Sequence, residues 1–328
     1  MADGDAKILM NGQSEQWYNV RRGKGVHRGD EAVTFSVGYQ PDRAWIDALV
    51  ARRPALHDVY FAYGATPSGR APLVDTDRQL EDLGRLADAG IPLHLLFNAN
   101  CYGARALSRA FLTEVGETVD RFAADGSLTG VTTTSPVLAR FIRANFSGLE
   151  IRASVNMEIG TVEGMEYLAD VFDAFYLKRE LNRDLDAVRA VKAWCDGHGK
   201  RLYLLANSGC LNNCSSHVFH DNLVAHEAEI ARADNGYAFR GTCWQWLAKP
   251  ANRALWHART NFIEPERVAD YEGLCVAMKL ATRINAHPVR ILESYASGRH
   301  LGPMQPLLEP NHAKLFEDLQ ESTTNTQR

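Results

Sequence analysis

The sequence of 328 residues lacks the features of several broad classes of protein. No stretch approaches the roughly 20 consecutive apolar residues of a membrane helix, and the N-terminal segment has no apolar core typical of a signal peptide. Six cysteines are too few for a disulfide scaffold in a chain of this length. These absences predict a cytoplasmic protein without a membrane partner, whose cysteines stay as thiols unless a metal binds them.

The motifs of several common enzyme classes are also missing. The sequence contains no GxxxxGK[ST] loop, no GxSxG elbow and no HExxH helix. A radical-SAM type C-x3-C-x2-C motif is absent because no third cysteine follows Cys214 at that spacing. Nucleotide hydrolysis, serine hydrolysis and zincin chemistry therefore have no motif support.

Charge gives no sign of an obligate nucleic-acid partner. Lys and Arg number 36 against 40 Asp and Glu, for a formal net charge of -4, and 45% of residues are hydrophobic. This balance is typical of an ordinary globular protein. Local basic patches leave nucleic acid open, but a small-molecule substrate is the expected partner.

What the sequence does contain is a series of short apolar runs, each followed by a segment with helical periodicity. This alternation is typical of βαβ units and a parallel sheet. Eight such units predict an α/β fold, a single-domain (β/α)8 barrel of the TIM type, with a doubly wound open sheet as the rival. The runs are 34–38, 59–63, 93–98, 130–133, 151–155, 174–177, 201–206 and 276–281.

The predicted barrel covers residues 31–310. It is preceded by an N-terminal extension, 1–30, and followed by a C-terminal tail, 311–328, whose last residues, 320–328, are expected to be disordered. About 70 residues separate the seventh and eighth runs, so an insertion at about 207–275 follows the seventh strand. Loops after the strands of such a barrel build active sites, and this insertion holds four of the six cysteines and four of the eleven histidines.

The cysteines sort by their position relative to the strands. Cys195 ends a helix before a strand and Cys275 directly precedes one, so both are expected near the amino-terminal face. The other four follow strands or lie in the insertion, and are expected to converge at the opposite face: Cys101, Cys210, Cys214 and Cys243.

Four converging thiolates suit a soft metal, either tetrahedral zinc or an iron-sulfur cluster. The C-x3-C spacing of Cys210 and Cys214 is looser than the C-x2-C of structural zinc sites, and the ligands come from distant segments, which favours the cluster. By itself this spacing is a weak signal, and the alternative is a set of buried cysteines that pack as small hydrophobes.

The segment LYLLANSGCLNNCSSHVFHDNLVAHEA, with NANCYG before it and NFIEPERVADYE and MKLATR after it, resembles the collagenase-like peptidase family (peptidase family U, number thirty-two). The resemblance covers about residues 90 to 300. Ser215 departs from the family pattern, in which a proline follows the second cysteine of this segment.

This resemblance implies a 4Fe-4S cluster on Cys101, Cys210, Cys214 and Cys243, because some members of the family are similar to oxygen-independent hydroxylases. Others are RNA-modifying proteins or act with a paralogous subunit. His220 and Asn222 match the HxN of the family pattern.

Other polar residues at the strand ends are candidates for catalysis or substrate binding. His217 and His220, with Asn222, are the catalytic candidates, since a histidine near neutral pKa can move a proton; packing or capping is the alternative. The candidates for binding an anionic substrate are Lys178, Arg179, Arg283 and Asn156, although such cations also pair with nearby acids.

Three functions follow from the sequence. The first is an iron-sulfur oxidoreductase, an oxygen-independent hydroxylase or redox tailoring enzyme acting on a small-molecule or natural-product substrate. The second is a peptidase, as the family name implies, although no nucleophile and base pair supports it. The third is an RNA-modifying or partner-dependent cluster protein.

Overall fold

The computed structural model describes residues 32–64, 66–70, 75–234 and 239–316. The predicted N-terminal extension, 1–30, and the predicted disordered end of the tail, 320–328, lie outside the described residues. The boundaries predicted for these segments therefore stay predictions.

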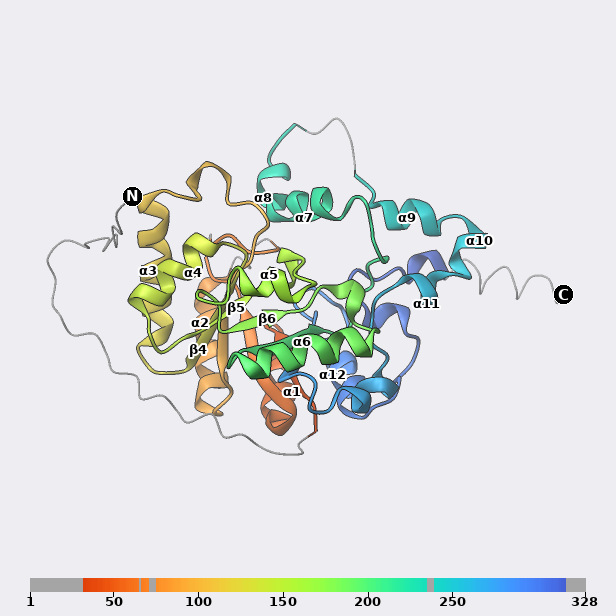
Figure 1. Ribbon diagram of the computed structural model, residues 1–328, viewed down its shortest axis with the longest axis horizontal. Coiled ribbons are helices and arrows are strands. Elements are labelled where there is room, and N and C mark those ends of the chain that lie inside the picture. Colours follow the sequence, from red (N-terminus) through yellow and green to blue (C-terminus); the bar gives the residue numbers. More distant parts are fainter. Residues whose placement is uncertain (1–31, 65, 71–74, 235–238, 317–328) are drawn as a thin grey trace, which may run out of the picture.

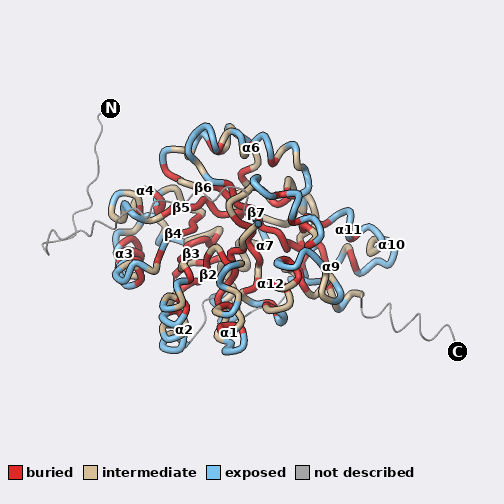
Figure 2. The backbone as a smooth tube through the Cα atoms, turned by 90° about the horizontal axis from the view of Figure 1, so that it is seen from below, coloured by how far each residue is buried: buried red, intermediate tan, exposed pale blue. Residues whose placement is uncertain are grey.

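Eight parallel strands form a closed barrel in chain order, with β8 pairing back onto β1. Each of the eight predicted runs contributes one strand, so the TIM-type barrel is confirmed and the open sheet is excluded. Figure 2 shows the buried strands at the centre of the molecule with helices around them. The strands are β1 (Thr34–Gly38), β2 (Leu56–Phe61), β3 (Leu93–Phe97), β4 (Leu128–Thr133), β5 (Glu150–Ala153), β6 (Ala174–Tyr176), β7 (Arg201–Leu205) and β8 (Ala277–Leu280).

Helices follow the strands and form the outer layer of the barrel (Figure 1). These are α1 (Arg43–Ala51), α2 (Thr76–Asp88), α3 (Arg109–Ala123), α4 (Pro136–Asn145), α5 (Val162–Glu166), α6 (Leu185–Gly197) and α12 (Pro288–Ala296). Between β7 and β8 lie α7 (His217–Ala225), α8 (Glu227–Ile230), α9 (Thr242–Leu247), α10 (Pro250–Arg253), α11 (Trp256–Arg259) and the 3-10 helix η5 (Pro265–Tyr271). None of the helices described is long and apolar enough to cross a membrane.

The helix boundaries follow from capping residues that the sequence displays. The Asp75 carboxylate accepts a hydrogen bond from the Arg78 amide at the start of α2, and the chain leaves that helix through Gly90 at φ +70°. The Asp184 carboxylate accepts from the Ala187 amide at 3.0 Å and begins α6 in the same way. Such caps satisfy backbone donors that have no partner within the helix.

The strands bury different side chains on their two faces. Outward residues such as Val37, Phe61 and Leu95 join a large apolar core against the helices. The inward face carries charged groups among apolar and aromatic ones: Asp58 of β2 and Arg152 of β5 form an ion pair at 2.6 Å although their strands are not neighbours. This contact therefore crosses the inside of the barrel.

The insertion after β7 packs over one end of the barrel, where α7, α8 and α9 form a layer above the strands (Figure 1). Buried Asn182 anchors it, because its Nδ2 donates to the carbonyls of Leu205 at 2.7 Å and Asn261 at 3.0 Å. Buried Asn207 joins the end of β7 to the C-terminal segment by donating to the Leu307 carbonyl at 2.9 Å. These hydrogen bonds therefore fix the insertion to the carboxyl face of the barrel.

Candidate functional site

The loop after β7 turns back sharply over the barrel. Asn213 has φ +53°, a left-handed conformation that asparagine tolerates better than most residues. Gly209 packs so closely on the C-terminal segment that a Cβ there would lie 2.1 Å from the Pro310 carbonyl oxygen. This local geometry sets Cys210 and Cys214 on the two sides of one turn, and α7 starts directly after it.

Three of the four predicted cluster cysteines lie within electrostatic reach of one another. Cys243, on α9, is buried. Burial raises the pKa of the Cys243 thiol to about 11, and the Cys210 and Cys214 thiols raise it further. We predicted that four sulfurs converge; these interactions join Cys243 to Cys210 and to Cys214, and the full ligand set stays a prediction.

Cys101 has a different immediate environment. Its sulfur accepts from the Gly103 amide at 3.4 Å. A hydrogen bond with His226 lowers the pKa of the Cys101 thiol. His226 lies at the junction of α7 and α8 and also bonds Glu229 at 2.9 Å. The insertion therefore folds over the Cys101 loop, but among the residues that the structure describes no three thiols lie close enough to share a single ion.

Cys195 and Cys275 lie in surroundings of their own. Burial raises the pKa of Cys195 to about 11 and that of Cys275 to about 12. The positive charge of Lys192 on α6 lowers the pKa of both thiols. It is not among the main influences on the other cysteines whose pKa is shifted. Cys195 and Cys275 therefore share Lys192 as a neighbour, and the predicted division of the six cysteines into four and two stays a prediction.

Arg179 lies at the centre of the candidate site, in the 3-10 helix η4 (Arg179–Leu181) after β6. Its guanidinium donates to Asn156 Oδ1 at 2.8 Å and lies 3.8 Å from Cys210 Sγ. It also contacts the His217 ring. The Nε of Arg179 is a buried donor without an acceptor among the described residues. One predicted anion-binding residue therefore faces a cysteine sulfur and keeps an unused hydrogen-bond donor.

Acidic groups and a histidine surround this guanidinium. Glu158 and Asp221 lie 3.9 and 3.6 Å from it, and His217 Nε2 lies 3.3 Å from Asp221. Glu158, Glu180 and His217 place ligand atoms within 4.8 Å of one another, so this group has the composition of a site for one metal ion. The positive charge of Arg179 within it opposes cation binding.

The other predicted site residues also lie on the carboxyl face. Lys178 pairs with Glu158 at 3.9 Å and is partly exposed. Arg283, after β8, donates to Ser68 Oγ at 3.4 Å, and burial lowers its pKa to about 10. Asn156 donates to the Asn98 carbonyl at 3.2 Å, which joins the loops after β5 and β3.

Helix α7 carries the remaining two candidates. Burial lowers the pKa of His220, and its ring lies 5.6 Å from that of Phe239. The His220 ring also approaches Gly241, close to Cys243. Asn222 is half-buried on the same helix. Neither residue is seen in contact with His217, so the three catalytic candidates share a helix without forming a hydrogen-bonded relay in the described structure.

A cluster of charged side chains inside the barrel, the charged floor, was not predicted from the sequence. Arg152 donates to Asp58 at 2.6 Å and to Glu150 at 2.8 Å, and its guanidinium lies 4.2 Å from the Tyr203 ring centroid. Lys279 lies in the same interior, 4.3 Å from the Tyr60 ring centroid. The available signal was a charged residue within some of the apolar runs, as in EIRA and AMKL.

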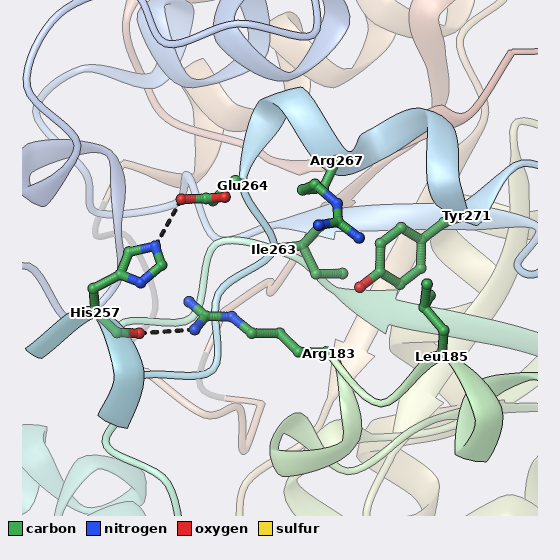
Figure 3. A pocket seen from close by; sticks show the side chains of 7 residues that line it. All are labelled: Arg183, Leu185, His257, Ile263, Glu264, Arg267 and Tyr271. Atoms are coloured by element: carbon green, nitrogen blue, oxygen red, sulfur yellow. Dashed lines mark hydrogen bonds and ion pairs between the residues drawn. The ribbon is translucent and has the colours of Figure 1, made fainter.

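A separate hollow of about 190 Å³ lies between α6, α11 and η5 (Figure 3). Its polar groups are already paired: Arg183 donates to the carbonyls of Phe262 and His257, both at 2.7 Å, and His257 bonds Glu264 at 2.7 Å. These contacts brace the insertion against the barrel. We therefore assign the hollow to the scaffold that holds the candidate site in place, and not to the site itself.

Comparison with known proteins agrees with the (β/α)8 barrel described above. No family model and no curated protein matches the sequence. The structure of the U32 peptidase Mk0906 is similar, with 15% identity, a TM-score of 0.55, and coverage of 76% of this chain and 92% of that chain. Phosphoribosyl anthranilate isomerase from Thermus thermophilus matches at 12% identity over 81% of this chain and 97% of its own, with a TM-score of 0.40. At such identity the likeness to the U32 peptidase shows a shared fold.

Proposed function

We propose that the protein is an iron-sulfur oxidoreductase, with Cys210, Cys214 and Cys243 as cluster ligands and Cys101 as the fourth. The observation that carries this proposal is the grouping of three thiols from two distant segments at the carboxyl face. Thiolates are the usual ligands of 4Fe-4S clusters. A cluster contains several metal atoms, so its thiolates stand further apart than the ligands of one zinc ion.

The surroundings of the thiols fit an anionic sulfur-ligated group. Burial raises the pKa of Cys210, and the adjacent Arg179 opposes this by stabilising the thiolate. The Arg179 Nε supplies a buried donor that lacks an acceptor among the described groups. Hydrogen bonds and nearby positive charge adjust the potential of such clusters.

When bound, the cluster would supply one-electron transfer for oxygen-independent hydroxylation or a related redox step on a small substrate. Residues of the chain itself would bind the substrate and accept or donate the proton. Arg283 is placed to hold an anionic substrate group at the mouth, since it has no carboxylate ion pair within the described part of the chain. Because burial lowers its pKa, His220 is neutral near pH 7 and can accept a proton.

Anaerobic purification with iron and sulfide quantification tests this proposal. We expect about four iron and four sulfide per chain and a broad absorption band near 400 nm, the signature of a thiolate-held 4Fe-4S cluster. Electron paramagnetic resonance after dithionite reduction should show a reduced cluster. Stoichiometric zinc, or no metal in protein prepared without oxygen, would contradict the proposal.

A single-metal hydrolase is the second candidate, because Glu158, Glu180 and His217 form a group that suits one ion. Metal-bound water is a hydrolytic nucleophile near neutral pH. We rank this function lower because Arg179 lies 3.9 Å from Glu158 and would repel the ion. Loss of bound zinc and of peptide hydrolysis in Glu158→Gln, with both retained in Cys210→Ala, would favour the hydrolase over the oxidoreductase.

A further inference from the structure

Lys279 of β8 is a buried amine that the cluster proposal does not use. Its Nζ lies 4.3 Å from the Tyr60 ring centroid and 5.5 Å from that of Tyr176. Within the described residues it makes no hydrogen bond and no ion pair. A lysine held between aromatic rings and without a carboxylate partner is unusual for a structural role, since buried charges are normally paired.

The charges around Lys279 favour the neutral amine. Burial lowers the pKa of Lys279 to about 7, and Arg283, Arg179 and Arg152 lower it further, while Asp58 opposes them. The Tyr60 and Tyr176 hydroxyls stay neutral, because burial raises the pKa of both. At pH 7 a far larger fraction of Lys279 than of an ordinary lysine, whose pKa is near 10.4, is therefore unprotonated.

Lys279 lies between the charged floor and the mouth of the barrel. Lys279 is 8% exposed, more than Arg152 at 2% and Asp58 at 1%, and about as much as Glu150 at 9%. Lys279 is the third of four residues in β8, towards the carboxyl end where barrel active sites are built. The amine is thus accessible from the side on which the proposed site lies.

Arg283, four residues further along, places a cation beside this amine. A Cβ at Gly38 would lie 2.9 Å from both the Arg283 Cβ and the Tyr60 ring, so glycine at this position lets Arg283 and Tyr60 pack together. Arg283 donates only to Ser68 Oγ among the described residues. The pair offers a nucleophilic nitrogen and, next to it, a guanidinium that suits a carboxylate.

We propose that Lys279 is a covalent catalytic residue that forms a Schiff base with the carbonyl group of a small 2-oxo acid, whose carboxylate Arg283 binds. The Nζ forms a bond to the carbonyl carbon and gives a carbinolamine. The carbonyl oxygen takes up protons and leaves as water, which yields a protonated C=N bond. No electrons are exchanged, so the step requires no oxidant or reductant and holds whether or not the cluster proposal is correct.

Reductive trapping tests this site directly. The full-length protein is incubated with glyoxylate and cyanoborohydride at pH 7, and the modified lysines are identified by peptide mass mapping. Cyanoborohydride gives hydride to the C=N carbon and leaves a stable secondary amine. We expect the adduct on Lys279 to exceed that on exposed Lys249 by about tenfold or more, because the neutral fraction of an ordinary lysine at pH 7 is below about 0.1%.

Matched variants separate chemistry from folding. Lys279→Arg keeps a cation at the position and should abolish the adduct, while Lys249→Met should leave it unchanged. Arg283→Met should reduce trapping of glyoxylate severalfold more than trapping of acetaldehyde, because acetaldehyde has no carboxylate and loses only the effect of Arg283 on the pKa of Lys279. Equal labelling of Lys279 and Lys249 would overturn the proposal. Trapping of glyoxylate that is unchanged in Lys279→Arg or in Arg283→Met would also overturn it.

Discussion

Replacing Arg152 with methionine tests the charged floor inside the barrel. Arg152 is 2% exposed and Asp58 is 1% exposed, and the guanidinium bonds both Asp58 and Glu150. The substitution keeps much of the side-chain volume but leaves two buried carboxylates without their main partner. Removing one partner of a buried ion pair costs about 3–5 kcal/mol, which lowers Tm by roughly 10 °C in a protein of this size.

The pH dependence of this effect has a definite sign. Burial raises the pKa of Asp58 and of Glu150, but Arg152 outweighs it and lowers both below their ordinary values. In the wild type the carboxylates therefore stabilise the fold above their unfolded pKa values, near 4, and this stabilisation is lost as the pH falls through that range. In Arg152→Met burial dominates at Asp58 and raises its pKa, while Glu150 keeps Arg201 at 2.9 Å, so the loss of stability as the pH rises comes mainly from Asp58.

Urea unfolding at pH 7 and pH 4.5 measures both effects. We expect the difference in the free energy of unfolding between wild type and Arg152→Met to be larger at pH 7 and to shrink at pH 4.5. The control is Arg189→Met, because Arg189 pairs with Asp186 at 2.9 Å but is 55% exposed. An exposed pair of this kind contributes about 0–1 kcal/mol. Equal destabilisation by the two substitutions would refute the assigned role of Arg152.

Three further substitutions test the support of the site. Gly209→Ala would place a Cβ 2.1 Å from the Pro310 carbonyl oxygen, so we expect the C-terminal segment to detach and be cleaved faster by protease. Asn207→Ala removes a fully buried amide that donates at 2.9 Å and accepts at 2.6 Å, which should lower the free energy of unfolding by about 1–3 kcal/mol in urea titration. Arg183→Met removes a guanidinium 4.6 Å from the Phe262 ring centroid, and should speed hydrogen exchange in the insertion while that of the barrel strands stays unchanged.

The barrel was predictable because strand and helix periodicities are local. Each predicted apolar run overlaps one strand, and Asp75 and Asp184 cap the helices that begin directly after them. Closure of the sheet was not visible in the sequence, because it depends on pairing between β1 and β8, which are about 240 residues apart. The predicted order of strands and helices was therefore right. The choice between a closed barrel and an open sheet needed the structure.

The candidate site was predictable only in part. The ends of strands indicated which cysteines share a face, and Cys210, Cys214 and Cys243 do lie together. The hydrogen bond of Cys101 with His226 could not be foreseen, because it depends on how the insertion folds over the β3 loop.

The charged floor and Lys279 were missed for a related reason. In an apolar strand, a single charged residue does not show in the sequence whether it faces inward or meets a partner. Arg152 and Asp58 are 94 residues apart and meet only across the closed barrel. The sequence contained the charges, but only the fold pairs them.

Iron content of cysteine variants tests the central claim most directly. Wild type, Cys210→Ala and Cys195→Ala would be prepared anaerobically in parallel, and iron and sulfide would be measured per folded chain. The account predicts that Cys210→Ala loses most of its iron, while Cys195→Ala retains about four per chain, because buried Cys195 lies on α6 among other neighbours. Equal iron in the two variants, or equal loss from both, would contradict the assignment of the cluster to the carboxyl face.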